Sequence, residues 1–305
     1  MKQKIAKQLS HRNRKKGIDM GRGFLYLLPW LIGFAVFKLY PILATAAYSF
    51  TNYNLFNATY SFIGLKNYES IFTSSRYMNS FAVTFKYAFL TVPLKLAFAL
   101  FIAHILNSKL KGIKFFRTAY YIPSILGGSV AIAVLWQFVW QNDGLVNQVL
   151  GFFGAQKVNW LGDPSYTLYV VSLLRVWQFG SAMVMFLAAL KNVPKDLYEA
   201  AMIDGASKVR TFFSITIPLI SPIIFYNIVT QLVQTFQEFN GPYIITQGGP
   251  MGSTTLITLL IYQNAFKTYN MGMASALAWL LFMIVAVLSV IAFTSQKYWV
   301  YYNED

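Results

Sequence analysis

The chain has 305 residues, of which 56% are hydrophobic and only 11% are charged. Soluble domains usually carry about 25% charged residues, so this composition excludes a disordered chain and indicates a polytopic membrane protein. Lys and Arg outnumber Asp and Glu by 25 to 10, and the absence of cysteine excludes disulfides, thiolate metal sites and cysteine nucleophiles.

Six apolar stretches are long enough to cross a membrane. About 20 mostly apolar residues are required, because each helical residue rises about 1.5 Å across a hydrocarbon core of about 30 Å. The sequence therefore predicts an all-α membrane protein with six transmembrane helices. In chain order the predicted spans are Phe24–Phe50, Phe81–Leu106, Ala119–Trp140, Tyr166–Leu190, Ile217–Phe239 and Gly272–Thr294.

The first span has an alternative interpretation as a cleavable signal peptide, because Ala44-Thr45-Ala46 resembles a cleavage site. Its apolar stretch is much longer than the usual hydrophobic region of about 7–15 residues. An uncleaved first helix is therefore favoured. Pro29 and Pro41 are expected to kink it, which membrane helices tolerate where neighbours satisfy the freed backbone groups.

Lys and Arg are unevenly divided between the two sides of these spans. Seventeen lie in the two tails and in segments 107–118 and 191–216, whereas four lie on the other side. Because cytoplasmic loops are enriched in these residues, both termini are predicted to be cytoplasmic. The basic charge then indicates orientation and contact with anionic membrane lipid, not nucleic-acid binding. The expected organisation is a basic tail (1–22), a six-helix transmembrane domain (23–295) and a C-terminal tail (296–305).

Four cationic residues lie inside the predicted spans. A charge in the middle of a bilayer is costly and is by default a candidate for function. Lys38, Lys86 and Lys95 are expected to extend along their aliphatic stems to the membrane surface. Arg175 lies deeper in its span, so both a structural ion pair and a role in a translocation path remain open for it.

The fifth predicted span carries a polar stripe. Its members, Asn227, Gln231, Gln234, Thr235 and Glu238, recur at helical spacing and share one face. Such a face must meet other helices or water. Interhelical hydrogen bonding would explain it, but five polar groups ending in a carboxylate favour the wall of a translocation path. Amides, a carboxylate and flanking aromatic rings also suit a sugar.

Candidates for enzyme chemistry are weak. The two histidines, His11 and His104, have no partner at metal-binding spacing. No P-loop motif occurs either, so the chain is not expected to bind ATP itself. The sequence therefore predicts a protein that is not an enzyme and binds no metal or other cofactor.

Segment 191–216 is predicted to form a helix–turn–helix on the cytoplasmic surface. Asn192 is expected to cap its first helix with Pro194 in the first turn, Gly205 to end that helix in a left-handed turn, and Ser207 to cap the second helix. An apolar surface for docking a partner is expected from Leu197, Tyr198, Ala201 and Met202.

The order Glu199-Ala200-Ala201, Asp204-Gly205-Ala206, Phe212, Ile215, Pro218 and Pro222 resembles the EAA loop of bacterial ABC importer permeases. Ile217 departs from the leucine usual in that family. Thr246-Gln247-Gly248-Gly249-Pro250 resembles the Thr-x-Gly-Gly-Pro motif of the carbohydrate branch, the maltose-type permeases. The resemblance extends from about residue 24 to the end and implies the ABC importer permease (MetI-like) fold.

The resemblance implies a permease subunit of a binding-protein-dependent importer of a sugar or oligosaccharide in the bacterial cytoplasmic membrane. Its implied partners are a second homologous permease, two ATPase subunits that hold ATP and Mg, and an extracytoplasmic sugar-binding protein. Gly248, Gly249 and Pro250 would lie in the loop on the side of that binding protein. The residues implied to couple to the ATPases are Glu199, Ala200, Ala201, Asp204 and Gly205.

The resemblance also implies where the sugar passes, because family sugar contacts fall on the spans on either side of the EAA loop. The implied positions are Gln231, Gln234, Thr235, Glu238 and Asn240, with Trp177, Gln178 and Ser181 as weaker candidates beside Arg175. Arg175 and the lysines could match an acidic or phosphorylated sugar, but Glu238 would oppose one, so a neutral or weakly charged oligosaccharide is favoured. The alternative class is a self-sufficient secondary carrier or channel.

Overall fold

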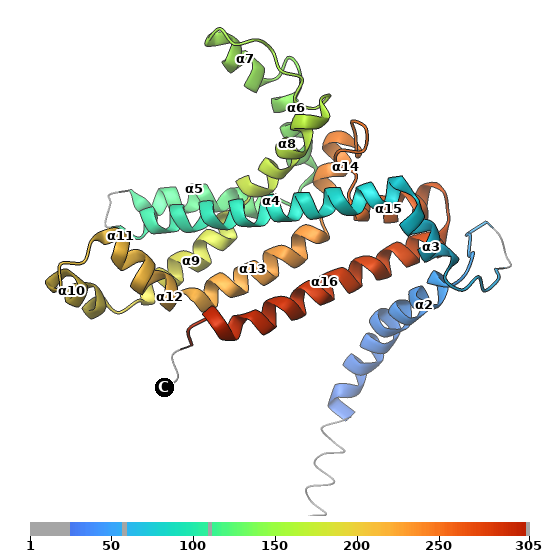
Figure 1. Cartoon of the computed structure of the whole chain (residues 1–305), viewed down its shortest axis with the longest axis horizontal. Coiled ribbons are helices and arrows are strands. Elements are labelled where there is room, and N and C mark those ends of the chain that lie inside the picture. Colours follow the sequence, from blue (N-terminus) through green and yellow to red (C-terminus); the bar gives the residue numbers. More distant parts are fainter. Residues whose placement is uncertain (1–24, 57–59, 109–111, 303–305) are drawn as a thin grey trace, which may run out of the picture.

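The computed structural model describes residues 25–56, 60–108 and 112–302 (Figure 1). In these ranges the regular elements are helices. Two isolated β-bridges are also present, one between Thr51 and Phe62 and one between Asn54 and Asn270. The predicted basic tail, 1–22, lies outside the described residues.

The chain begins with a helix over Leu25–Ser49, which contains the π-helical turn η1 (Ala35–Leu39) and α2 (Tyr40–Ser49). The elements of the first half are α3 (Lys66–Thr73), α4 (Ser75–Leu106), α5 (Ile113–Leu126), α6 (Val130–Trp140), α7 (Leu145–Phe152), α8 (Pro164–Trp177) and α9 (Gly180–Asn192). Those of the second half are α10 (Lys195–Ile203), α11 (Lys208–Thr211), η2 (Phe212–Thr216), α12 (Ile217–Leu219), α13 (Ser221–Phe236), α14 (Asn240–Thr246), α15 (Ile257–Tyr262), η3 (Gln263–Lys267) and α16 (Met271–Trp299).

Three described helices are long and apolar enough to cross a membrane unbroken: Leu25–Ser49, α4 and α16. The other three predicted spans correspond to helix pairs bent at short breaks. If each bent pair is one span, the described residues hold six, as the sequence predicts. α16 continues to Trp299, past the predicted domain boundary at residue 295.

The prediction of a continuous third span is wrong. The chain bends by 104° between Ile113–Leu126 and Val130–Phe152, so α5 lies along α4 whereas α6 leads away from it (Figure 1). Gly127 and Gly128 supply the break between α5 and α6, and two consecutive glycines weaken a helix. The fourth and fifth spans bend by 47° and 68°, at Gln178–Phe179 and at Ile220.

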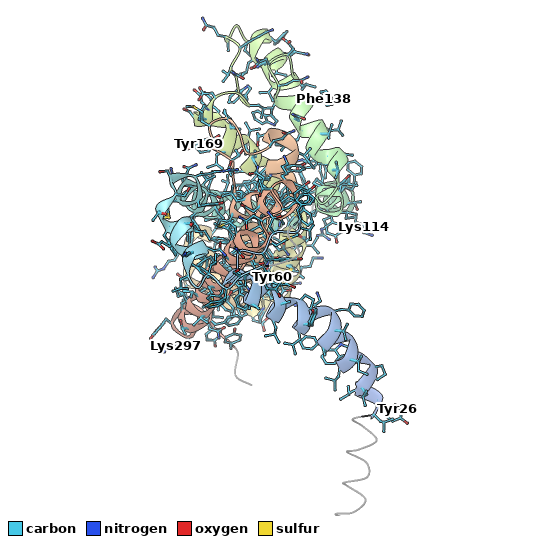
Figure 2. All side chains as sticks on the ribbon, turned by 90° about the vertical axis from the view of Figure 1, so that its right-hand side faces the viewer. Tyr26, Tyr60, Lys114, Phe138, Tyr169 and Lys297 are labelled. Atoms are coloured by element: carbon cyan, nitrogen blue, oxygen red, sulfur yellow. The ribbon has the colours of Figure 1, made fainter. Side chains whose placement is uncertain are left out.

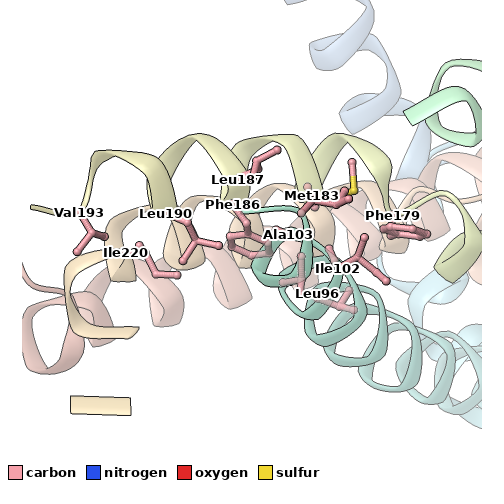
Figure 3. Close-up of a cluster of buried hydrophobic side chains, with 14 residues drawn as sticks. Leu96, Ile102, Ala103, Phe179, Met183, Phe186, Leu187, Leu190, Val193 and Ile220 are labelled. Carbon is pink, nitrogen blue, oxygen red and sulfur yellow. The ribbon is translucent and has the colours of Figure 1, made fainter. Parts of the chain in front are cut away.

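The centre of the bundle is α4, which packs against α8, α9 and α13. The C-terminal half of α4 and α9 form the largest apolar cluster. In it, Met183 and Phe186 on α9 are completely or almost completely buried (Figure 3). In lipid, such side chains stabilise helix packing through van der Waals contact. This cluster fixes how α9 leads into the segment that follows it.

Large apolar side chains also cover the outside of the helices. Phe138 and Tyr169 point away from the body and are more than half exposed (Figure 2). The helix Leu25–Ser49 extends away from the bundle, and none of its most apolar window is buried, although α2 packs against α16 (Figure 1). Such surfaces fit a lipid environment and contact with other membrane helices.

Candidate functional site

The segment between α9 and α13 projects from one end of the bundle, where α10 and α11 lie beside the end of α4 (Figure 1). α10 ends in a Schellman motif, in which Ala206 N–H donates to Ala201 O (2.9 Å) and Gly205 N–H donates to Met202 O (3.1 Å). Gly205 has φ +70°, the left-handed turn that the sequence predicts. Glycine adopts this conformation at little steric cost.

The second helix of this segment is capped as expected, because Ser207 Oγ accepts the N–H of Arg210 (3.3 Å). The expected cap of the first helix is wrong. Asn192 belongs to the end of α9, and Pro194 occupies the N-cap position of α10 instead of its first turn. α9 persists two residues beyond the predicted end of the span at Leu190, and its last turn packs on the core through that residue.

Of the four residues predicted to form an apolar docking surface on α10, Leu197 and Met202 are exposed, whereas Tyr198 and Ala201 are not. Ala201 is buried, and the Tyr198 hydroxyl lies 2.9 Å from Thr216 Oγ1, so both hold α10 against its own chain. Met202 and Ile203 are 74% and 86% exposed. The other residues assigned to coupling, Glu199, Ala200, Asp204 and Gly205, are exposed.

Behind α10 lies a groove of about 550 Å³. His104 and Asn107, at the end of α4, face Tyr198, Lys208 and Phe212 across it. The His104 ring meets the Phe212 ring edge to face at 5.0 Å. α10 is therefore attached to the rest of the chain along one side, and the groove separates its other side from the end of α4.

The residues assigned to the substrate path partly come together at the bend between α8 and α9. Arg175 Nη1 lies 3.5 Å from Glu238 Oε2, and Arg175 Nη2 donates to Gln234 Oε1 (3.1 Å). Arg175 Nη1 also lies 3.5 Å from Gln178 Oε1. The Arg175 and Glu238 side chains are 18% and 16% exposed. Removing one partner of a buried ion pair costs about 3–5 kcal/mol, so this pair fixes the geometry around it.

Glu238 and Gln178 are also held by the backbone around them. The amide N–H of Gly241 donates to Glu238 Oε1 (3.2 Å), and Gln178 Nε2 donates to Gly127 O (3.1 Å). A Cβ on Gly127 would lie 2.6 Å from the Gln178 side chain. The break between α5 and α6 therefore allows Gln178 to approach the backbone closely.

A narrow cavity of only about 10 Å³ opens between these groups. It holds about one water molecule and no larger ligand. The residues around it include Tyr87, Gly127, Arg175, Gln178, Glu238 and Asn240.

Two weaker candidates have structural contacts. Trp177 is 36% exposed, and its ring lies 5.9 Å from that of Trp136. Ser181 donates its N–H to Ser124 Oγ (3.0 Å), which joins α9 to α5. Neither side chain reaches the group around Arg175 through a hydrogen bond.

The predicted polar stripe divides in two. Asn227, Gln231 and Thr235 are buried within the bundle, whereas Gln234 is exposed and Glu238 lies beyond the end of α13 at Phe236. Asn227 Nδ2 donates to Ile223 O (2.9 Å) in its own helix. The buried half therefore makes contacts inside the protein, and the other half meets Arg175.

Lys95 does not reach the membrane surface, and that prediction is wrong. It is 3% exposed, and its Nζ donates to Gln231 Oε1 (2.7 Å), because α4 directs it towards α13. Lys38 and Lys86 are exposed on the outside of their helices.

A second polar stripe, which sequence reasoning missed, runs along α4. Its members lie at i, i+4, i+7, i+11 and i+15, and all are at most 3% exposed. Their helical spacing was present in the sequence, but the large apolar residues between them concealed it. The stripe consists of Ser80, Thr84, Tyr87, Thr91 and Lys95.

At the opposite end from α10, residues 246–255 form a tight loop. Gly248 has φ +90°, and a Cβ there would lie 2.6 Å from Thr255 Oγ1, so only glycine fits. Thr254 Oγ1 donates to Gly249 O (2.9 Å), and Thr255 Oγ1 donates to Gly248 O (2.8 Å). The Gly249–Pro250 peptide is cis. The loop presents Met251, 92% exposed, at its tip.

Metal chemistry has no support in the described ranges, where no three His, Cys, Asp or Glu side chains gather into a possible metal site. The arrangement can bind polar groups and change shape.

Comparisons with known proteins agree on one family. Residues 95–300 match the family described as "Binding-protein-dependent transport system inner membrane component". The chain is 46% identical to the probable ABC transporter permease protein YesP of Bacillus subtilis (strain 168), over 92% of each chain. It is 33% identical to the trehalose/maltose transport system permease protein MalF of Thermococcus litoralis, over 95% of this chain and 97% of the relative.

A solved structure shares the fold. The crystal structure of a bacterial alginate ABC transporter, in complex with an alginate pentasaccharide-bound periplasmic protein, contains a chain that superposes with a TM-score of 0.77. The match covers 92% of this chain and 96% of that chain at 23% identity.

Proposed function

The chain belongs to the family of binding-protein-dependent transport system inner membrane components, and from that premise we propose that it carries a sugar or oligosaccharide past Arg175 and Gln234. It is a multi-pass permease subunit of an ABC importer in the cytoplasmic membrane, with the fold of such permeases. This class and this fold were predicted from the sequence and are confirmed.

The observation that carries the sugar proposal is the joined polar group that Arg175, Gln178, Gln234 and Glu238 form beside the bend between α8 and α9. Sugar hydroxyls both donate and accept hydrogen bonds, and amide and ion-pair side chains satisfy both roles. The relative named for trehalose and maltose transport supports the same substrate class. Asn240 and Thr235 border this group and are proposed as further contacts.

We propose that α10 is the coupling helix, and that it docks on an ATPase subunit through Glu199, Ala200, Asp204 and Gly205. Ala201 then acts from the inside, by letting α10 lie close to its own chain. ATP and Mg reside on two ATPase subunits, and this chain binds neither. ATP-driven closure of the ATPases would push α10 and, through the core around Met183 and Phe186, change the angle between α8 and α9.

A second, homologous permease is proposed to complete the path. The uncovered helix Leu25–Ser49 supports this partner, because none of its most apolar window is buried in its own chain. At the other end of the bundle, the loop with Gly248, Gly249 and Pro250 is proposed to face the extracytoplasmic binding protein. Both termini are then cytoplasmic.

The test is to purify the tagged chain in mild detergent from its native host and to identify what co-elutes. We expect a second permease and an ATPase, and sugar uptake by the reconstituted complex only with ATP and the binding protein. A chain that elutes alone, and transports sugar alone without ATP, would instead be a self-sufficient carrier or channel.

A further inference from the structure

The Lys95 side chain is a buried cation without a countercharge. It is 3% exposed, and its single hydrogen bond in the described structure goes to a neutral group, Gln231 Oε1, at 2.7 Å. Among the described residues no carboxylate lies within 4 Å of its Nζ. Buried ammonium groups are expected to be paired with an anion, because desolvation is costly.

The neighbouring charges do not supply that anion. Arg175 and Glu238 both lie near enough to interact electrostatically with Lys95. Both carboxylate oxygens of Glu238, however, already have partners. Arg175 Nη1 lies 3.5 Å from one of them, and the Gly241 N–H donates to the other. Arg175 and Glu238 are thus paired with each other, which leaves the Lys95 amine without an anionic partner among the described residues.

Hydroxyl groups without partners lie between Lys95 and the ion pair. Thr91 is one helical turn before Lys95 on α4, and Thr235 is one turn after Gln231 on α13; both are buried, and neither hydroxyl has a hydrogen bond in the described structure. α4 ends, and α13 begins, at the end of the bundle that carries α10 and α11 (Figure 1). Both threonines therefore lie on the same side of the Lys95–Gln231 contact, towards Glu238.

We propose that the transported saccharide bears an anionic group, and that Lys95 supplies its countercharge when the path opens. This inference rests on the proposed function and names the substrate class of that path. In the closed form, Gln231 holds the ammonium. In the loaded form, a carboxylate or phosphate of the sugar replaces the Gln231 amide, and the hydroxyls of Thr91 and Thr235 bind oxygens of the same ligand.

This inference reverses the expectation of a neutral sugar. That expectation rested on repulsion by Glu238, but a carboxylate held by Arg175 and a backbone N–H repels an anion far less than a free one. The remaining charge of the group is the positive charge of Lys95. The alternative is that the Lys95–Gln231 contact serves only to join α4 to α13.

The experiment uses the complete importer, captured through a tag on this chain and reconstituted in liposomes with its binding protein. Two pairs of probes differ mainly in charge: trigalacturonate against its fully methyl-esterified form, and glucose 6-phosphate against glucose. The variants are Lys95→Met and, as the control that keeps the charge, Lys95→Arg. Radiolabelled uptake and assembly of the complex are measured for each.

We expect import of an anionic probe in preference to its neutral counterpart. Lys95→Met should lower uptake of that anion about ten- to a hundredfold, the worth of one hydrogen bond to a charged group. Uptake by Lys95→Arg should stay within a few-fold of the native protein. Trigalacturonate as the imported probe identifies a carboxylate, and glucose 6-phosphate identifies a phosphate.

Two results would overturn the inference while leaving the proposed function intact. One is preferential import of the neutral probes. The other is an equal effect of Lys95→Met on charged and neutral probes, which would assign Lys95 to the joint between α4 and α13. If the ATP-hydrolysing complex imports no saccharide of either charge, the proposed sugar function fails, and this inference fails with it.

Discussion

Two glutamines on α13, three residues apart, accept hydrogen bonds from different basic side chains. Gln231 is buried and accepts from Lys95, whereas Gln234 is exposed and accepts from Arg175. In the closed form the buried bond has no water to replace it, whereas Gln234 can exchange Arg175 for water or for a sugar hydroxyl. The same substitution at the two positions should therefore have different effects.

We predict that Gln231→Leu destabilises the complex by about 1–3 kcal/mol, because it leaves the Lys95 ammonium without an acceptor. Gln234→Leu should leave assembly unchanged and raise the KM for the transported sugar about tenfold. Thermal melting of the purified complex and uptake kinetics measure the two effects. Loss of assembly in Gln234→Leu, with normal transport by the surviving complexes, would make Gln234 an interhelical contact.

Gly205 offers a test of the coupling helix, since proline cannot adopt its φ of +70° and would lose the N–H that bonds to Met202 O. Gly205→Pro should lower uptake about tenfold or more while membrane insertion stays normal.

Gly154→Pro is the matched control. Gly154 has φ +79°, donates its N–H to Gly151 O (3.0 Å) and follows α7, far from α10 (Figure 1). A Cβ at either glycine would meet nothing within 4 Å. Equal losses of uptake in the two variants, or none in Gly205→Pro, would contradict the role of α10.

The bent helices show how elements are held at their breaks. At the start of α9, a Cβ on Gly180 would lie 2.4 Å from Tyr120 O and 2.8 Å from Tyr121 Cα. These are backbone atoms of α5, and real Cβ atoms do not approach so closely. Glycine thus permits α5 and α9 to pack in contact, directly beside the bend that carries Arg175 and Gln178.

We predict that Gly180→Ala forces α5 and α9 apart and costs about 1–3 kcal/mol of stability, as overpacked sites do. Gly128→Ala is the control, because a Cβ at Gly128 meets nothing within 4 Å. Thermal melting of the purified complex should decrease for the first variant and stay within a degree or two for the second. A similar melting temperature for both would show that α5 is free to move away.

At the scale of elements, the sequence predicts the apolar segments, turns and caps better than the angles between helices. The six apolar stretches, the left-handed turn at Gly205 and the cap at Ser207 follow from local residue types, and the structure contains them. The glycine pair 127–128 is a local signal for the first bend, but the size of the bends there and at Ile220 does not follow from residue types. Likewise, nothing local distinguishes Lys95 from Lys86, because burial of Lys95 depends on α13, more than a hundred residues later.

The whole molecule has two functional ends separated by the length of α4. α10 and α11 lie at one end, and the loop with Met251 lies beside the start of α4, where Asn79 Nδ2 donates to Gly252 O (3.3 Å). The uneven distribution of Lys and Arg predicts that the α10 end is cytoplasmic. The absence of cysteine makes this orientation directly testable, because one introduced thiol is the only one present.

We predict that a membrane-impermeant maleimide labels Met251→Cys in intact spheroplasts. Met251 is 92% exposed. Asp196→Cys, at the exposed start of α10, should react only after the membrane is permeabilised. The native chain is the control for background labelling. The reverse pattern would place both termini outside and would contradict docking of α10 on a cytoplasmic ATPase.

The uncovered helix Leu25–Ser49 also bears on how the importer is made. Its most apolar window is not buried in its own chain, so in a newly inserted copy only lipid covers that part of the helix. Until the second permease binds, we expect membrane proteases that degrade unassembled chains to recognise this helix. The abundance of this chain should therefore follow synthesis of its partner, and excess copies should be degraded instead of accumulating.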